Sequence, residues 1–213
     1  MTAAAAASPS AEFWEPRFQQ GDPGWGRQPN ARFTAILPGL ALRPGLAWDL
    51  GCGHGGDALW LASLGWHVTA TDVSPTAVRR VAAAAVQREL RHRVTAEQHD
   101  LSRTLPEGTF HLVYACYFHS PVPLDRDRIL RDAADRVRPG GCFVLIDHAS
   151  AAPWSWRPDD REPEFPTPAE ALASLHLRTG WGTERCERAD RVATGPDGQT
   201  ATVTDNVVVL RRL

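Results

Sequence analysis

The sequence predicts a single α/β domain, doubly wound around a mostly parallel sheet of seven strands. Three observations favour it. Short apolar runs alternate with helical patterns between residues 46 and 146, a glycine-rich turn follows the first run, and a turn at 195–198 separates two strand-like runs. The 213 residues are 43% hydrophobic and 23% charged, which is sufficient for one well-packed domain.

The first part of this pattern contains two strand–helix units. Residues 46–50 form a short apolar run that stops at the glycine turn, as buried parallel strands do. Residues 57–64 have helical spacing, and a second strand at 66–71 stops at Asp72. A serine–proline pair at 74–75 supplies an N-cap and a first helical residue for the next helix.

The same alternation continues to residue 146. Strands are predicted at 94–99, 110–116 and 142–146, with a helix at 126–137 before the last of them. Pro139-Gly140-Gly141 is expected to break the chain between that helix and that strand. Repeated strand–helix–strand units at this spacing predict a parallel sheet with helices on both faces.

The two ends of the chain depart from this pattern. Residues 1–10 are alanine-rich and are expected to form a disordered tail. The rest, 11–213, is expected to be one domain, of which 11–45 is a helical lid segment. Turn residues at 195–198 and a strand-like run at 201–210 predict a C-terminal antiparallel hairpin that closes one edge of the sheet.

Composition excludes several classes of function. The net charge is −2, so the chain has no basic field for nucleic acid, and the absence of lysine excludes Schiff-base chemistry. The longest apolar runs have the length of strands, so no membrane span is expected. The four cysteines are scattered, which favours a reducing cytoplasm. We therefore expect a cytoplasmic monomer or homodimer that acts on a small molecule.

The glycine turn at 51–56 is the most informative feature. Gly51, Gly53 and Gly56 spell G-x-G-x-x-G between a strand and a helix, and Asp72 ends the next strand. Glycine lets the backbone approach a ligand closely, and an acid at that position accepts both ribose hydroxyls. The pattern fits a nicotinamide dinucleotide as well as S-adenosylmethionine, and a tight turn without a ligand is a third interpretation.

Asp49 favours S-adenosylmethionine over a dinucleotide. It lies two residues before Gly51, where its carboxylate would repel a pyrophosphate but would balance the ammonium group of S-adenosylmethionine. Gly51, Gly53 and Gly55 also fit the pattern D/E-x-G-x-G-x-G. A long segment of helical and aromatic character precedes the turn, whereas nicotinamide domains usually open near their glycine strand.

Five short motifs occur in order along residues 46–148. They are Asp49-Leu50-Gly51-Cys52-Gly53-His54-Gly55, Thr71-Asp72-Val73-Ser74, His99-Asp100-Leu101, Phe110-His111-Leu112-Val113 and Arg138-Pro139-Gly140-Gly141. In this order and spacing, the sequence resembles the class I S-adenosylmethionine-dependent methyltransferases, whose sheet is Rossmann-like. The resemblance implies the same fold, activity and cofactor.

The resemblance also implies which residues bind the cofactor. They are Asp49, Gly51, Cys52, Gly53, Asp72, Val73, Asp100, Leu101 and Cys116. Asp72 would bind the ribose, and Asp100 would bind the adenine amino group or, alternatively, cap a turn. Cys116 would lie beside the sulfonium, or would simply pack as a small hydrophobic residue.

The N-terminal segment places four aromatic residues between positions 13 and 25. They indicate either a helix face packed on the domain or a lid that excludes water from the transferring methyl group. The segment resembles the start of the thiopurine and tellurite-resistance type of methyltransferase, which would place Trp14 and Phe18 over the cofactor and Trp25 in the acceptor pocket. The sequence departs from that type at Cys116, where the type has a charged residue, and at 121–124.

Two histidines follow predicted strands at the edge where ligands bind in doubly wound sheets. His119 and His148 are candidate general bases, although each could instead bond a backbone carbonyl. Phe118 and Trp154 are candidates for binding the acceptor together with them. No spacing of histidine, cysteine or acidic residues favours a metal site.

The sequence therefore predicts methyl transfer to a small-molecule acceptor, with a thiol or another soft heteroatom as the nucleophile. A thiol needs no strong base, because part of it is already thiolate at neutral pH. A hydroxyl or ring-nitrogen acceptor would need a histidine base. Two rival functions remain open: a nicotinamide-dependent oxidoreductase, and a non-catalytic partner subunit with the same fold.

Overall fold

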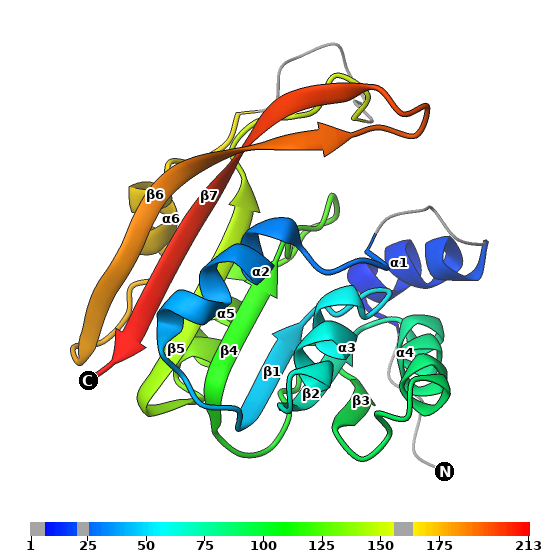
Figure 1. Cartoon of the computed structure of the whole chain (residues 1–213), viewed down its shortest axis with the longest axis horizontal. Helices are drawn as coiled ribbons and strands as arrows, with labels where there is room; N and C mark the ends of the chain where they lie inside the picture. The colour runs from blue at the N-terminus through cyan, green and yellow to red at the C-terminus, as the bar shows by residue number, and fades with distance from the viewer. Residues whose placement is uncertain (1–6, 21–25, 156–163) are drawn as a thin grey trace.

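The computed structural model describes residues 7–20, 26–155 and 164–213. Its strands form one seven-stranded sheet in the order β3-β2-β1-β4-β5-β7-β6 (Figure 1). The strands are β1 (Leu46–Leu50), β2 (His67–Asp72), β3 (Val94–Gln98), β4 (Phe110–Cys116), β5 (Val137–His148), β6 (Trp181–Thr194) and β7 (Thr200–Arg212). Strands β1 to β5 pair in parallel, whereas β7 is antiparallel to both β5 and β6. This confirms the predicted doubly wound sheet with a C-terminal antiparallel hairpin.

Helices cover both faces of the sheet (Figure 1). They are α1 (Pro9–Gln19), α2 (Ala31–Ile36), a 3-10 turn (Leu37–Leu40), α3 (Gly56–Ser63), α4 (Pro75–Gln87), α5 (Arg126–Ala134) and α6 (Pro168–Ser174). Apolar side chains of α2, α3 and α4 pack on one face, and those of α5 and the end of α6 pack on the other. Neighbouring residues of β1 alternate between the two cores: Ala47 belongs to the first and Trp48 to the second.

The boundaries of α5, β5 and α1 differ from the predicted ones. Helix α5 ends at Ala134, and β5 begins at Val137 and continues through the expected breaker at 139–141. The strand accommodates these residues as a bulge, because Val137 pairs with Phe110 and Cys142 already pairs with Leu112. At the other end, α1 begins at Pro9, inside the range expected as a tail.

The β6–β7 hairpin overhangs the carboxyl end of the parallel strands. Residues 205–211 of β7 pair with β5, whereas residues 200–204 extend past His148 and pair with β6. Figure 1 shows the tip of this hairpin projecting above the sheet, on the side where α1 lies. In the part of the chain that the structure describes, no helix is long and apolar enough to cross a bilayer.

Candidate active site

A cavity of about 500 Å³ lies at the carboxyl ends of β1, β2 and β4, with α1 over it. Most sequence-predicted site residues line it. They are Trp14, Phe18, Asp49, Gly51, Cys52, Gly53, Asp72, Val73, Asp100, Leu101, Cys116, Phe118, His119 and His148. Trp154 lines a second, adjoining cavity, and Trp25 lies outside the described residues. The fold thus brings together residues from positions 14 to 148 at one edge of the sheet.

The glycine turn has the backbone that its sequence requires. Gly51 and Gly53 have positive φ angles of 67° and 52°, which glycine adopts without strain. A Cβ at Gly51 would lie 2.8 Å from the ring of Phe118. Any side chain at either position would therefore strain the turn, and at Gly51 it would also displace the aromatic wall of the cavity.

The third glycine of the dinucleotide pattern, Gly56, contacts the chain itself. Its N–H donates to the carbonyl of Gly26 at 3.0 Å, and a Cβ would lie 2.4 Å from the carbonyl oxygen of Gln28. In a dinucleotide site, this helix N-terminus would face the pyrophosphate. Here the backbone at 26–28 covers it, and the N–H of Asn30 donates to Asp57 at 2.6 Å. The geometry argues against a pyrophosphate.

Asp72 is held rigidly at the end of β2. Its two carboxylate oxygens accept N–H bonds from Gly53 and Ser74, each at 2.9 Å. Burial raises the pKa of Asp72 to about 6, although these backbone bonds lower it. The side chain is 7% exposed and lines the cavity, so its remaining lone pairs are available to ligand hydroxyls.

Three carboxylates surround the glycine turn: Asp49 and Asp72 are buried, and Asp57 is partly buried. Burial raises the pKa of Asp49, Asp57 and Asp72, and the negative charges of Asp57 and Asp72 raise that of Asp49 further. Among the described residues, no ion pair joins any of the three to a basic side chain. The Oδ2 atom of Asp49 is buried without a hydrogen-bond partner. Such a cavity favours a cationic ligand, as the ammonium and sulfonium groups of S-adenosylmethionine require.

Two predicted residues have structural roles that the sequence left open. Asp100 caps a turn, because its Oδ1 atom accepts bonds from the N–H and hydroxyl of Ser102 at 3.0 and 2.6 Å. It nevertheless lines the cavity. Burial raises the pKa of the Cys116 thiol well above its usual range, and the charges of Asp57 and Asp49 add to the effect. Cys116 is therefore a neutral part of the cavity wall.

Residues 47–141 match a family model described as a methyltransferase domain. The core of this chain is therefore similar to a methyltransferase domain. The match supports the predicted cofactor, S-adenosylmethionine, and the seven-stranded sheet already confirms the predicted fold class. An uncharacterised methyltransferase of Synechocystis is 32% identical over 126 residues, which is 57% of this chain and 56% of that protein. The chain spans 34%, 36% and 56% of the length of three curated relatives that it matches.

Solved structures share the fold of the methyltransferase domain at low identity. One comes from a study of the conversion of a disulfide bond into a thioacetal group during echinomycin biosynthesis. It superposes with a TM-score of 0.72 at 22% identity and covers 95% of this chain and 92% of that one. The glycopeptide N-methyltransferase MtfA complexed with sinefungin gives 0.63 at 15% identity, with 99% and 100% coverage. Both matches cover nearly the whole chain.

Glu15, which the sequence analysis missed, fastens α1 to the N-terminus of α4. Glu15 accepts hydrogen bonds from the hydroxyls of Ser74 and Thr76 and from the N–H of Thr76 at 3.1 Å. Burial would raise the pKa of Glu15, but these bonds outweigh it and lower the pKa to about 2. The carboxylate thus caps the N-terminus of α4, beside Asp72.

The two predicted histidines lie at the mouth of the cavity in different environments. The Nε2 atom of His119 is 3.2 Å from the Oδ1 atom of Asp147, whose carboxylate also accepts two bonds from Arg126. His148 stacks on Tyr117 with ring centroids 3.9 Å apart. Burial, together with the neighbouring His119, lowers the pKa of His148 to about 4, so its imidazole is neutral at pH 7.

Asp147 carried a sequence signal that the prediction did not use. It directly follows a run of apolar residues at 142–146, as Asp72 follows the second strand. The pairing joins His119, three residues past the end of β4, to Asp147, the second-last residue of the adjacent strand β5. Among the described residues, no cluster of histidine, cysteine and acidic side chains could hold a metal ion.

Proposed function

We propose that this protein transfers a methyl group from S-adenosylmethionine to a small-molecule acceptor, with a thiol or another soft heteroatom as the nucleophile. The observation that carries the proposal is the meeting of two cavities at His119 and His148. The first cavity is lined by Asp49, Asp57 and Asp72, whose negative charge suits the cationic cofactor. The second cavity would give an acceptor access to the same edge of the sheet.

The residues of the first cavity suit the parts of the cofactor. Asp72 would accept the ribose hydroxyls, Asp49 would balance the ammonium group, and Val73 and Leu101 would flank the adenine. When bound, S-adenosylmethionine supplies an electrophilic methyl group on a sulfonium. Trp14 and Phe18, which line both cavities, would exclude water from the reacting atoms.

The pair of His119 and Asp147 favours a second candidate, an acceptor whose hydroxyl or ring nitrogen loses a proton. A buried carboxylate at 3.2 Å orients the imidazole. His119 would then accept the proton that leaves the acceptor. His148, which is neutral and stacked, would act as part of the wall. We further propose a cytoplasmic monomer or homodimer without nucleic-acid partners.

The proposal is tested by measuring release of S-adenosylhomocysteine with thiols, phenols, amines and chalcogen oxyanions as acceptors. We expect turnover with at least one thiol or phenol. Calorimetric titration with S-adenosylhomocysteine and with NADH separates the cofactor classes, and binding of NADH without binding of S-adenosylhomocysteine would sink the proposal. Cofactor binding without turnover of any acceptor would instead support a non-catalytic subunit.

A further inference from the structure

The second cavity is larger than a simple thiol or an oxyanion needs. Its volume is about 1280 Å³, and it lies between α1, the segment that follows β5, and the overhanging β6–β7 hairpin. Pockets of roughly 300–1,000 Å³ hold drug-sized ligands. The two cavities share residues at their junction. These are Trp14, Phe18, Tyr117, His119, Ser120 and His148.

Aromatic rings make up much of its wall. Phe13 and Trp14 of α1 meet edge to face, with centroids 5.1 Å apart. Phe165 meets His148 edge to face at 6.4 Å, and Trp154 packs against the hairpin turn at Gly195. Rings from α1, from the end of β5, from residues 154 and 165 and from the residues that follow β4 therefore line one cavity. Such a wall favours a flat, conjugated ligand.

Two arginines of this wall have different surroundings. Arg191 donates to the fully buried Asp205 at 2.8 Å, and the hydroxyl of Tyr117 donates to the other oxygen of the same carboxylate. Arg17 lies over the ring of Phe13, 3.4 Å from its centroid, and donates to the carbonyl of Phe13. Arg17 forms no ion pair within the described residues, so its charge is available to a ligand anion.

We propose that the second cavity is the acceptor site for a flat, multi-ring aromatic compound that carries an anionic group. Its rings contact Trp154 and the other aromatic side chains, its anion pairs with Arg17, and its nucleophilic heteroatom points toward His119. The inference rests on the proposed function and narrows it. It assigns acceptor specificity to Trp154 and Arg17, which lie outside the cofactor cavity.

The transfer balances without a further reactant. The bond between the donor sulfur and its methyl carbon breaks, and its electron pair stays on that sulfur. A new bond forms between the methyl carbon and the acceptor heteroatom. The proton of that heteroatom passes to Nδ1 of His119, because Nε2 faces Asp147, and is then released to solvent.

The test uses four thiols that differ in ring number and charge: thiophenol, thiosalicylate, 2-naphthalenethiol and 3-mercapto-2-naphthoate. The corresponding four hydroxyl compounds are assayed in parallel, at saturating S-adenosylmethionine. We expect the second ring and the carboxylate each to raise kcat/KM about tenfold. Equal kcat/KM across both series would overturn the proposal.

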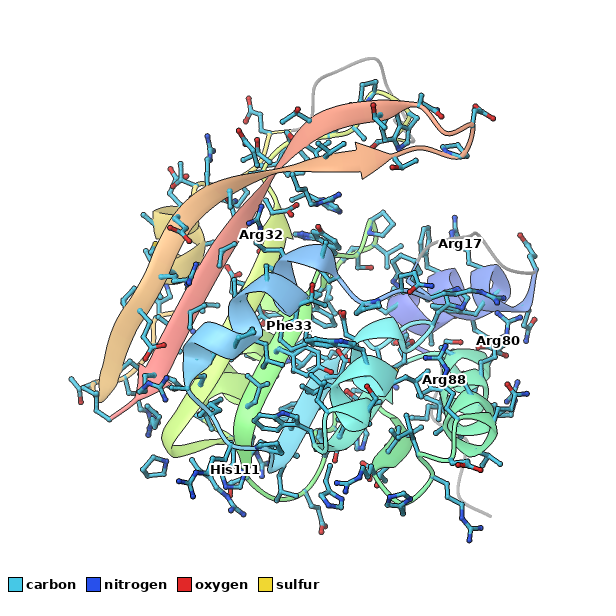
Figure 2. The ribbon with its side chains drawn as sticks, viewed as in Figure 1. Arg17, Arg32, Phe33, Arg80, Arg88 and His111 are labelled. Carbon is cyan, nitrogen blue, oxygen red and sulfur yellow. The ribbon has the colours of Figure 1, made fainter. Side chains whose placement is uncertain are left out.

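Two variants assign these effects to residues. Arg17→Met is expected to lower kcat/KM about fivefold for the carboxylated compounds and to leave the others unchanged. Trp154→Ala is expected to lower it about tenfold for the two-ring compounds, whereas Trp154→Phe retains most of it. Arg88→Met is the matched control, because this exposed arginine directly follows α4, whereas Arg17 lies on the side of α1 nearer the hairpin (Figure 2). Uniform losses on all compounds would contradict the assignment.

A binding measurement separates failure of this inference from failure of the proposed function. Fluorescence titration of the protein, saturated with S-adenosylhomocysteine, uses 8-anilinonaphthalene-1-sulfonate as a multi-ring anion. We expect Arg17→Met and Trp154→Ala each to raise its Kd at least about fivefold. Weakened binding without turnover of any compound would support the cavity and reject the methyl-transfer proposal. Turnover with unchanged probe binding in both variants would reject the cavity.

Discussion

The imidazole of His119 lies 3.2 Å from the carboxylate of Asp147, which is 2% exposed and clamped by Arg126. His119 follows β4 and Asp147 lies near the carboxyl end of the adjacent strand β5, close to the residues where the two cavities meet. Arg126 donates to both oxygens of Asp147 and holds the carboxylate in place, and the carboxylate in turn orients the imidazole of His119.

The first prediction concerns proton acceptance by this pair. His119→Asn is expected to lower kcat about 100-fold or more with hydroxyl acceptors and much less with thiols, which are partly ionised already. The readout is initial-rate kinetics with phenol and thiophenol of matched ring size. His148→Ala is the control and should retain cofactor binding. An equal loss of kcat on both acceptor classes would mean that His119 does not act as a base.

The second prediction concerns the ribose site. Asp72→Ala is expected to abolish cofactor binding, because the substitution removes the acceptor of the ribose hydroxyls. In the unaltered protein, the affinity for S-adenosylhomocysteine should fall as the pH is lowered through about 6, where Asp72 becomes protonated. Calorimetric titrations between pH 5 and pH 8 measure this directly. A flat profile would show that the ionised form of Asp72 is not needed.

The third prediction concerns stability without a ligand. When the pKa of an acid is higher in the folded protein than in the unfolded chain, the folded protein binds more protons. For Asp72 the pKa is raised from 3.8 to about 6. The contribution of Asp72 to the free energy of unfolding is therefore lost as the pH rises between these two values. Asp49→Asn removes one buried carboxylate and should raise the Tm of the free protein by about 3 °C or more while weakening cofactor binding. Differential scanning calorimetry with and without S-adenosylhomocysteine checks both effects. A lower Tm for the variant would contradict this account.

The fourth prediction concerns the attachment of α1 to α4. Glu15→Gln should speed dissociation of S-adenosylhomocysteine about tenfold, because the amide replaces charged bonds to Ser74 and Thr76 with weaker ones. Stopped-flow displacement of a fluorescent cofactor analogue measures the rate. Glu12→Gln on the same helix is the control, since Glu12 is exposed. Unchanged dissociation rates in both variants would show that α1 is not held by Glu15.

The sheet, and the edge of it at which the cavity lies, were predictable because the sequence patterns that indicate them are local. A run such as 46–50 specifies a buried strand, and a doubly wound sheet brings the carboxyl ends of its strands to one edge. The location of Gly51 and Asp72 at the cavity therefore follows from their positions at the ends of predicted strands. The bulge at 139–141 was not predictable, because proline and glycine there indicate a break unless the neighbouring strand is known.

The contacts of α1 with the rest of the protein could not be predicted from the sequence. Glu15 bonds to residues about sixty positions away, and nothing in the pattern of α1 specifies which helix receives it. The orientation of His119 depends likewise on Asp147, which reaches it because β4 and β5 are neighbours. Side-chain pairs of this kind depend on tertiary packing rather than on local periodicity.

The crossing of the chain over Gly56 has a consequence for engineering this protein. The N–H of Gly56, which a nucleotide phosphate would need, already donates to the carbonyl of Gly26. Selectivity against a nucleotide phosphate therefore depends partly on residues that precede the glycine turn in the sequence. Grafting residues 49–56 into another scaffold would carry over an ambiguous loop. Transplanting them together with residues 26–30 would carry over the selectivity as well.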